Sequence, residues 1–285
     1  MHTTASQNRH LILVPLCGIG NRLRTIASAR RLCFLSGARC SVVWDWGDFW
    51  RYFEDIADVN IAESTPTPVD SVVHHRPLHT HPSSLHEVDI TIGSVELHSA
   101  YVFWNRGEPP IGIKEVLPYI PRLQPKLQMV VDEFARDNLR DAVGLHIRRT
   151  DCRESIARSP DSVFLERAAE VVKAGKKIFL ATDNRATVRQ MCDVFGDSIV
   201  TFPKRHDLVQ RWPRAFDPVA LEDDLIDLFL LARTEYVLGS YWSSFSELAM
   251  VLNGSSRSKI LKKLAPSSRF ATDIGCHRSS DDTSA

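Results

Sequence analysis

The sequence predicts an α/β fold made of two Rossmann-like, doubly wound halves that face each other across a cleft. Three observations predict it: short apolar runs alternate with helical stretches, this alternation appears in two parts of the chain, and a poorly patterned segment separates the parts. Strands alternating with helices form parallel sheets covered on both faces, because right-handed crossovers place the helices there. A chain of 285 residues is long enough for two cores.

The first half, about residues 1–125, opens with a predicted β-α-β unit. Residues 11–16 form an apolar run that stops at "CGIGN", and apolar residues then follow at helical spacing up to Gly37. Residues 39–45 indicate the next strand.

The segment from about 66 to 125 is the least regular part of the first half. Prolines and histidines interrupt it, and only the short pieces 88–92 and 99–104 favour strands.

The second half, about residues 140–260, has the clearer alternation. A helix over 127–139 precedes it. Strands are predicted over 142–147, 176–183, 198–202 and 235–240, with helices over 162–175, 184–196, 220–234 and 243–254. The polar tail 267–285 lacks periodicity and is expected to be disordered.

Composition excludes several classes of protein. Lys+Arg and Asp+Glu are both 35, so no global positive field attracts nucleic acid. No apolar run approaches the roughly 20 residues of a transmembrane helix, and the first residues lack a signal-peptide pattern. The six scattered cysteines indicate reduced thiols, so we expect a soluble, cytoplasmic protein.

Polar side chains follow several predicted strands of the second half. Ligands of open parallel sheets bind outside the carboxyl ends of the strands, so these residues are candidates for a site. They are His146, Arg148, Arg149, Asp151, Asp183, Asn184, Ser240, Ser243 and Ser244. Two cations, hydroxyls at a helix start and carboxylates are the groups expected around a phosphorylated nucleoside.

The two arginines admit two interpretations. A guanidinium matches phosphate oxygens bidentately and stays charged in a partly buried site, so Arg148 and Arg149 could clamp phosphate. Alternatively, one of them forms a structural ion pair with Asp151 or a nearby helix carboxylate. The pattern alone favours neither interpretation.

The start of the last helix also has two interpretations. Ser244 and Glu247 have the spacing of a capping box, so Ser244 could simply begin the helix. A helix start also presents free N–H groups and the positive end of the helix dipole, which suit phosphate. Both roles can coexist on different serines.

Two further features are weaker. "CGIGN", with Gly18 and Gly20, allows either close approach of backbone to a ligand or only a tight turn, and Leu23 stands where a dinucleotide fingerprint needs glycine. Asp227 interrupts an apolar helix, which indicates either a solvated face or a side chain that contacts ligand.

The motifs of several enzyme classes are missing from the sequence. It has no phosphate loop, no H-E-x-x-H and no D-x-D pair, so no metal is expected. Several histidines lie close together in the sequence, but Pro77 and Pro82 interrupt this segment. The prolines prevent His75 and His79 from lying on one face of a regular helix, where they could bind a metal together. The histidines of this segment are His74, His75, His79, His81 and His86.

Four segments together resemble the fucosyltransferase superfamily that includes nodulation and core α1,6-fucosyltransferases and protein O-fucosyltransferases. They are "GIGN", "HIRRTD", "FLATDN" and "LIDLFLLARTEYVLGSYWSSF", in the family's order. The resemblance implies a GT-B fold whose second domain holds GDP-fucose, and metal-independent transfer of fucose with inversion.

The resemblance also implies roles for single residues. Arg148 matches the essential arginine on the diphosphate, and Arg149 the second arginine of the α1,6 branch. His146 and Asp227 match guanosine contacts, and Asp183 falls in the nucleotide pocket. The residues matched to the phosphate region are Ser243, Ser244 and Phe245, while Gly18, Gly20, Asn21 and Arg22 belong to the first loop.

The chain departs from the family in two ways. It is short, so the acceptor, whether a small molecule, a glycan or a lipid, does not follow from the resemblance. Its first loop has no carboxylate, which leaves Asp45 and Asp48 as candidates for the general base. A transferase that uses another GDP-sugar and a non-catalytic GDP-binding protein are the alternatives.

Overall fold

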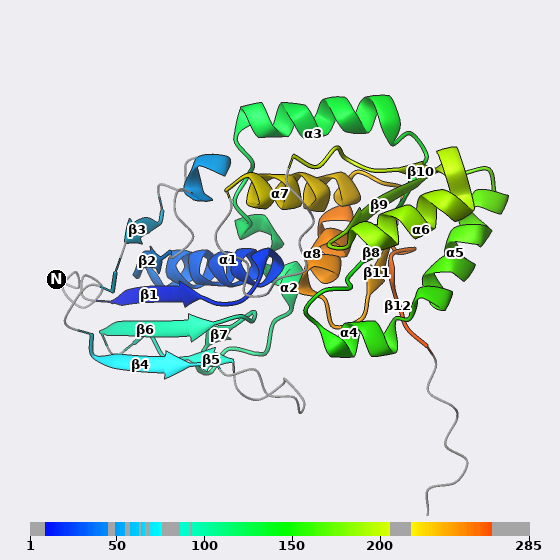
Figure 1. The fold of residues 1–285 in the computed structure, drawn as a ribbon. Helices are drawn as coiled ribbons and strands as arrows, with labels where there is room; N and C mark the ends of the chain where they lie inside the picture. Colours follow the sequence, from blue (N-terminus) through cyan, green and yellow to red (C-terminus); the bar gives the residue numbers. More distant parts are fainter. Residues whose placement is uncertain are drawn as a thin grey trace, which may run out of the picture.

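The structure is a computed structural model that describes residues 9–44, 49–54, 58–62, 64–65, 69–75, 86–91, 93–205 and 218–263. Several sequence predictions fall outside these ranges: Asp45, Asp48, His79, His81 and the tail 267–285. The described residues form two five-stranded parallel sheets and a small two-stranded one (Figure 1).

The N-terminal sheet has the strand order β3-β2-β1-β6-β4, and the paired strands are parallel. Its elements are β1 (His10–Pro15), α1 (Ile19–Ser36), β2 (Arg39–Val43), β3 (Asn60–Ala62), β4 (Ser71–His74) and β6 (Ser94–Ser99). Smaller elements are η1 (Phe49–Tyr52), β5 (Glu87–Val88), β7 (Trp104–Asn105), α2 (Ile113–Val116) and η2 (Leu117–Tyr119). The predicted β-α-β unit is confirmed as β1, α1 and β2.

The central strand β6 was not predicted, and it lies between the two pieces that favoured strands. Its buried residues Val95, Leu97 and Ser99 alternate with half-buried Ser94, Glu96 and His98, so it contains no apolar run. Residues 88–92 contribute only the end of β5. The strand is held by pairing with β1 and β4 and by burial of Val95 and Leu97 in the core.

The C-terminal sheet has the order β10-β9-β8-β11-β12, also with parallel pairs. Its strands are β8 (Val143–Ile147), β9 (Ile178–Thr182), β10 (Ile199–Val200), β11 (Val237–Ser240) and β12 (Lys259–Leu261). Its helices are α3 (Pro125–Asn138), α4 (Arg153–Arg158), α5 (Asp161–Lys173), α6 (Arg185–Phe195), α7 (Pro218–Ala232) and α8 (Ser244–Asn253), with η3 (Gly196–Ser198). The predicted alternation is confirmed here, while α4 and β12 were not predicted.

Each face of the C-terminal sheet has its own hydrophobic core. On one face, β8 and β9 bury Leu145 and Leu180 against Phe164 of α5 and Met191 of α6. On the other face they pack on α7, whose outer side carries α3 (Figure 1). No helix within the described ranges is both long and apolar enough to cross a membrane.

Helix α1 joins the two halves. Its Leu23 and Ile26 belong to the same hydrophobic core as Leu225 of α7 and Leu248 of α8. Figure 1 shows β1, β6 and β4 pointing their carboxyl ends toward the C-terminal half, with α1 beside α7 and α8. The carboxyl edge of the N-terminal sheet therefore meets the second half directly.

Gly20 permits the closest part of this junction. A Cβ atom at Gly20 would lie 2.7 Å from the backbone of Ser244 and from the backbone nitrogen of Phe245. The backbone of α1 at Gly20, which has no side chain, therefore packs directly against the backbone of the first turn of α8. The close backbone approach expected of "CGIGN" is made to another helix.

We predict that Gly20→Ala lowers the free energy of unfolding by about 1–3 kcal/mol, because two packed helix backbones must separate to admit the methyl group. Gly18→Ala is the matched control, since a Cβ at Gly18 meets nothing within 4 Å. Chemical denaturation measures both variants. Equal destabilisation by the two substitutions would show that the α1–α8 contact is not tight.

Candidate functional site

Arg148 lies directly after β8, at the carboxyl edge of the C-terminal sheet. Its Nε and Nη2 atoms donate to the two carboxylate oxygens of Asp151 at 2.8 and 2.6 Å, a bidentate pair. Burial acts to lower the pKa of Arg148, but the hydrogen bond and the charge attraction to Asp151, together with the charge of Asp183, outweigh burial and raise the pKa. The structural ion pair with Asp151 is thus present, and it holds a permanently charged, largely buried guanidinium in one orientation.

Arg149 and Asp183 hold the backbone of the same loop. Arg149 donates to Asp161, to the Arg148 carbonyl and to the Ser159 carbonyl, and its side chain is only 8% exposed. The Asp183 carboxylate accepts from the backbone N–H of Arg149 and from the Thr150 hydroxyl. Both side chains therefore shape the loop that carries Arg148.

The start of α8 is capped by Ser243 and not by Ser244. The Ser243 hydroxyl accepts the N–H of Ser246, while Ser244 is the first helical residue. Glu247, the expected capping-box partner of Ser244, instead forms an ion pair with Arg24 of α1. This pair crosses the junction of the two halves and competes for the Glu247 carboxylate, which explains the departure from the capping-box expectation.

His146 is buried beside the start of α8. Its Nδ1 lies 2.6 Å from the Ser246 hydroxyl, and its ring stacks on Phe245 with centroids 4.7 Å apart. Ser246 Oγ also accepts the Ser240 N–H, so this hydroxyl links His146 of β8 to the end of β11. Burial, with repulsion from Arg148, lowers the pKa of His146 to about 3, so the ring is neutral.

Ser240 ties β8 to β11 at this edge. Its hydroxyl donates to the His146 carbonyl and accepts the backbone N–H of Arg148. The structure therefore brings His146, Arg148, Ser243, Ser244 and Phe245 together at one place.

Asp227 of α7 is buried, with one carboxylate oxygen bound and one not. Oδ2 accepts from Lys204 Nζ at 2.5 Å, whereas Oδ1 has no hydrogen-bond partner among the described residues. Burial raises the pKa of Asp227 to about 6, against the opposing effect of Lys204. The positive charge of Lys204 also helps lower the pKa of His146, which places these groups in one neighbourhood.

The first loop reaches this neighbourhood from the N-terminal half. Arg22 donates to the Cys17 carbonyl and lies over the Trp44 ring, so it fixes the loop. Partial burial of the thiol raises the pKa of Cys17, and the charges of Arg22, Arg24 and Arg148 oppose that shift. The charge of Arg148 is therefore felt at the tip of the β1–α1 loop.

Helix α1 begins without a side-chain cap. Its N-cap is Gly18, which has no side chain to accept the first N–H groups. Asn21 follows in the first turn, and its Oδ1 is buried without a hydrogen-bond partner in the described part of the chain. The helix starts of α1 and α8 thus meet beside Arg148, and both present positive dipole ends.

Sequence reasoning missed Arg24, Lys204 and Ser246. Each acts through a partner far along the chain: Glu247, Asp227 and His146 respectively. No local spacing could have indicated them. Asp45 and Asp48, the candidate bases, belong to the residues that the structure does not describe.

Four of the described histidines, His74, His75, His86 and His98, gather near the carboxyl edge of the N-terminal sheet. His74 and His98 have ring centroids 4.4 Å apart, and His86 stacks on Tyr101 at 4.6 Å. Within the described ranges, no three His, Cys, Asp or Glu side chains are grouped as metal ligands.

Two parallel α/β sheets joined near their carboxyl edges are the arrangement of the GT-B glycosyltransferase fold. The solved structures that resemble this chain are of that class. The predicted fold class is thereby confirmed. No protein-family model and no curated protein matches the sequence.

The similar structures include three different fucosyltransferases. NodZ from Bradyrhizobium is 18% identical over 85% of this chain and 93% of its own, with a TM-score of 0.56. An Arabidopsis thaliana FUT1 variant in complex with GDP is 12% identical over 88% of this chain and 69% of its own, with a TM-score of 0.56. POFUT1 in complex with GDP is 11% identical over 89% of this chain and 99% of its own, with a TM-score of 0.54. At these identities the likeness establishes the fold.

We predict that Lys204→Met raises the pKa of Asp227 above its value of about 6, because the substitution removes the cation that stabilises the carboxylate. The native state then keeps a proton that the unfolded state loses near pH 4, so the free energy of unfolding falls more steeply between pH 4 and 7. Carboxyl ¹³C NMR and pH-dependent denaturation measure both effects. Lys126→Met on α3 is the control, and an unchanged Asp227 pKa would contradict the pairing.

Proposed function

We propose that this chain is a glycosyltransferase that moves L-fucose from GDP-fucose to an acceptor. One observation carries the proposal: Arg148 is held by Asp151 at the meeting point of two helix starts, on a fold shared with fucosyltransferases solved with GDP or GDP-fucose. Residues 1–125 would then form the acceptor-side domain and residues 140–260 the domain that binds the GDP-sugar.

The phosphates of the donor would lie against Arg148 and the start of α8. The bidentate contact with Asp151 leaves the remaining guanidinium N–H groups of Arg148 to donate to phosphate oxygens. The backbone N–H groups of Ser244 and Phe245 begin α8, next to the cap Ser243. Arg149 and Asp183 serve as positioning residues, because their polar groups bind the loop.

The nucleoside would lie against His146 and Asp227. An ionised aspartate is an acceptor only, and the free Oδ1 of Asp227 suits the adjacent N–H donors of guanine. Adenine and uracil do not offer that pair of donors. A neutral imidazole stacked on Phe245 adds a flat, uncharged wall.

Transfer would proceed by departure of GDP as the acceptor hydroxyl attacks the opposite side of the sugar, with inversion. The transition state is oxocarbenium-like, and negative charge grows on the β-phosphate as the bond to the sugar breaks. A cation already fixed by Asp151 stabilises that charge more than it stabilises the bound donor, without reorganisation. Arg148 would thus supply the counter-charge without a metal.

The acceptor would approach from the N-terminal sheet, where Gly18, Asn21 and Arg22 line the first loop. A small molecule, a glycan or a lipid could each be the acceptor. Asp45 and Asp48 remain the proposed candidates for the base that takes the proton of its hydroxyl.

Calorimetric titration with GDP, UDP and ADP in buffer containing EDTA tests the donor site. We expect GDP to bind at least tenfold more tightly than the other two, with no added metal, because only guanine satisfies Asp227. Binding of none of the three would reject the proposal, and equal binding would reject the role of Asp227. Release of GDP from GDP-fucose and from GDP-mannose then separates fucose transfer from use of another GDP-sugar.

We predict that Arg148→Ala lowers the turnover of GDP-fucose by about 10²–10³-fold, the usual cost of losing one preorganised group at a developing charge. Arg136→Ala on α3 is the matched control, since the Arg136 side chain is 68% exposed and pairs with the neighbouring Asp137. Circular dichroism checks that both variants fold. A folded, fully active Arg148→Ala protein would contradict the mechanism.

A further inference from the structure

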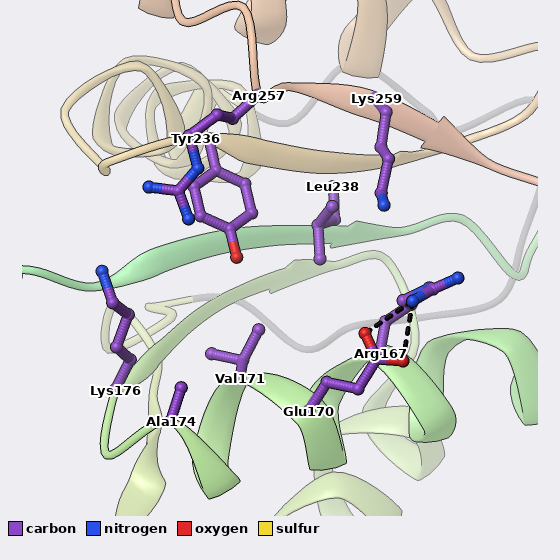
Figure 2. Close-up of a pocket in the computed structure, with 9 residues that line it drawn as sticks. All are labelled: Arg167, Glu170, Val171, Ala174, Lys176, Tyr236, Leu238, Arg257 and Lys259. Carbon is purple, nitrogen blue, oxygen red and sulfur yellow. Dashed lines mark hydrogen bonds and ion pairs between the residues drawn. The ribbon is translucent and has the colours of Figure 1, made fainter.

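A second pocket opens at the opposite, amino edge of the C-terminal sheet, with a volume of about 340 Å³ (Figure 2). It lies between α5 and the beginnings of β11 and β12, and it contains none of the residues of the candidate site. We call it the amino-edge pocket; its floor is Val171, Leu238 and Tyr236, and its rim is Arg167, Arg257 and Lys259.

The topology of the sheet explains why a pocket forms here. The chain runs from β8 outward to β9 and β10, and then returns to place β11 and β12 on the other side of β8. Right-handed crossovers put helices on opposite faces when the direction reverses, so α5 covers β9 while α8 covers β11 from behind. The amino ends of β11 and β12 are left open beside α5 (Figure 2).

The pocket has an apolar floor. Val171 and Leu238 belong to the core beneath α5 and are almost fully buried, and the Tyr236 ring packs against the same core. Figure 2 shows the side chains of Leu238 and Val171 pointing toward each other across the pocket. A ligand seated here would bury apolar surface against them.

The rim carries more positive than negative charge. Arg167 pairs with Glu170, and Lys176 and Arg257 share the single carboxylate of Glu235. Lys259 forms no ion pair with any described residue. Four cations against two carboxylates leave two uncompensated positive charges around the opening.

We propose that the amino-edge pocket binds a phosphomonoester that carries a flat or apolar body. Its volume lies in the range of small-molecule sites. Lys259 and Arg257 would contact the dianionic phosphate, for which the guanidinium fork is well shaped. The Tyr236 ring, already under the Arg257 guanidinium at 4.2 Å, and the floor of Val171 and Leu238 would contact the body.

Calorimetric titration of the full chain with phenyl phosphate tests the proposal. We expect Lys259→Glu to weaken binding at least tenfold, and Ala174→Trp to do the same by filling the pocket from an exposed position without changing its charge. Lys126→Glu, which reverses an exposed charge on α3, should leave binding unchanged. Phenyl phosphate affinity that is equal in the wild type and both pocket variants would overturn the proposal.

Inorganic phosphate tests the apolar floor separately. It should bind at least tenfold more weakly than phenyl phosphate, because it gains nothing from Tyr236 and Val171. Equal affinities would overturn the assignment of an apolar body. The Arg148→Ala protein should bind phenyl phosphate as tightly as the wild type does. Weaker binding by this variant would show that phenyl phosphate occupies the donor site instead of the amino-edge pocket.

Vesicles separate the two sources of such a ligand. Flotation with phosphatidic acid vesicles, compared with phosphatidylcholine vesicles and lost in Lys259→Glu, would support a lipid headgroup. Phenyl phosphate binding without flotation would support a soluble phosphoester. If the protein neither floats with these vesicles nor binds phenyl phosphate, the proposal is overturned. GDP affinity measured on the same variants is expected to be unchanged, so the result does not depend on the proposed transferase activity.

Discussion

The contact between the first turns of α1 and α8 is the constraint on which the rest of the molecule depends. Gly20 lets the two helix backbones touch, and the Arg24–Glu247 ion pair crosses the same contact. Beneath it, α1 shares one hydrophobic core with α7 and α8. Because α1 follows β1 directly and α8 follows β11 directly, the contact between α1 and α8 sets the carboxyl edges of the two sheets against each other.

The site follows from that placement and from a loop that is held on every side. Asp183, Ser240 and Arg149 bind the backbone around Arg148, and Asp151 fixes its guanidinium. The polar groups are thus oriented before any ligand arrives, which is what electrostatic stabilisation of a leaving group requires. Burial lowers the pKa of His146 and keeps its ring neutral, and it raises the pKa of Asp227, whose ionised form is stabilised by Lys204.

One topological feature accounts for the positions of both the candidate site and the amino-edge pocket in the C-terminal half. The strand order reverses between β8 and β11, and ligands of such sheets bind at the carboxyl ends beside that reversal. The same reversal sends α5 and α8 to opposite faces and leaves the amino ends of β11 and β12 uncovered on the α5 side. The two sites therefore lie at opposite edges of one sheet and can be tested independently.

The sequence by itself determined the fold class and most of the C-terminal half. The strands 143–147 and 178–182 are mostly apolar because both of their faces are buried, and this signal is local. Residues at the ends of those strands could also be listed, since parallel strands end at a common edge. The strand β6 has no such apolar run, because only Val95 and Leu97 on one of its faces are apolar and Ser94, Glu96 and His98 lie on the other.

Only the tertiary structure decided which polar residues act on which. Ser243 caps α8, while Glu247 pairs with Arg24, which lies 223 residues away from it in the sequence. Arg149 and Asp183 bind the loop, while Lys204 reaches Asp227 and Gly20 packs against the start of α8. The physical reason is common to all of them: hydrogen bonds and backbone contacts between residues far apart in sequence depend on how the elements pack, and spacing along the chain does not record it.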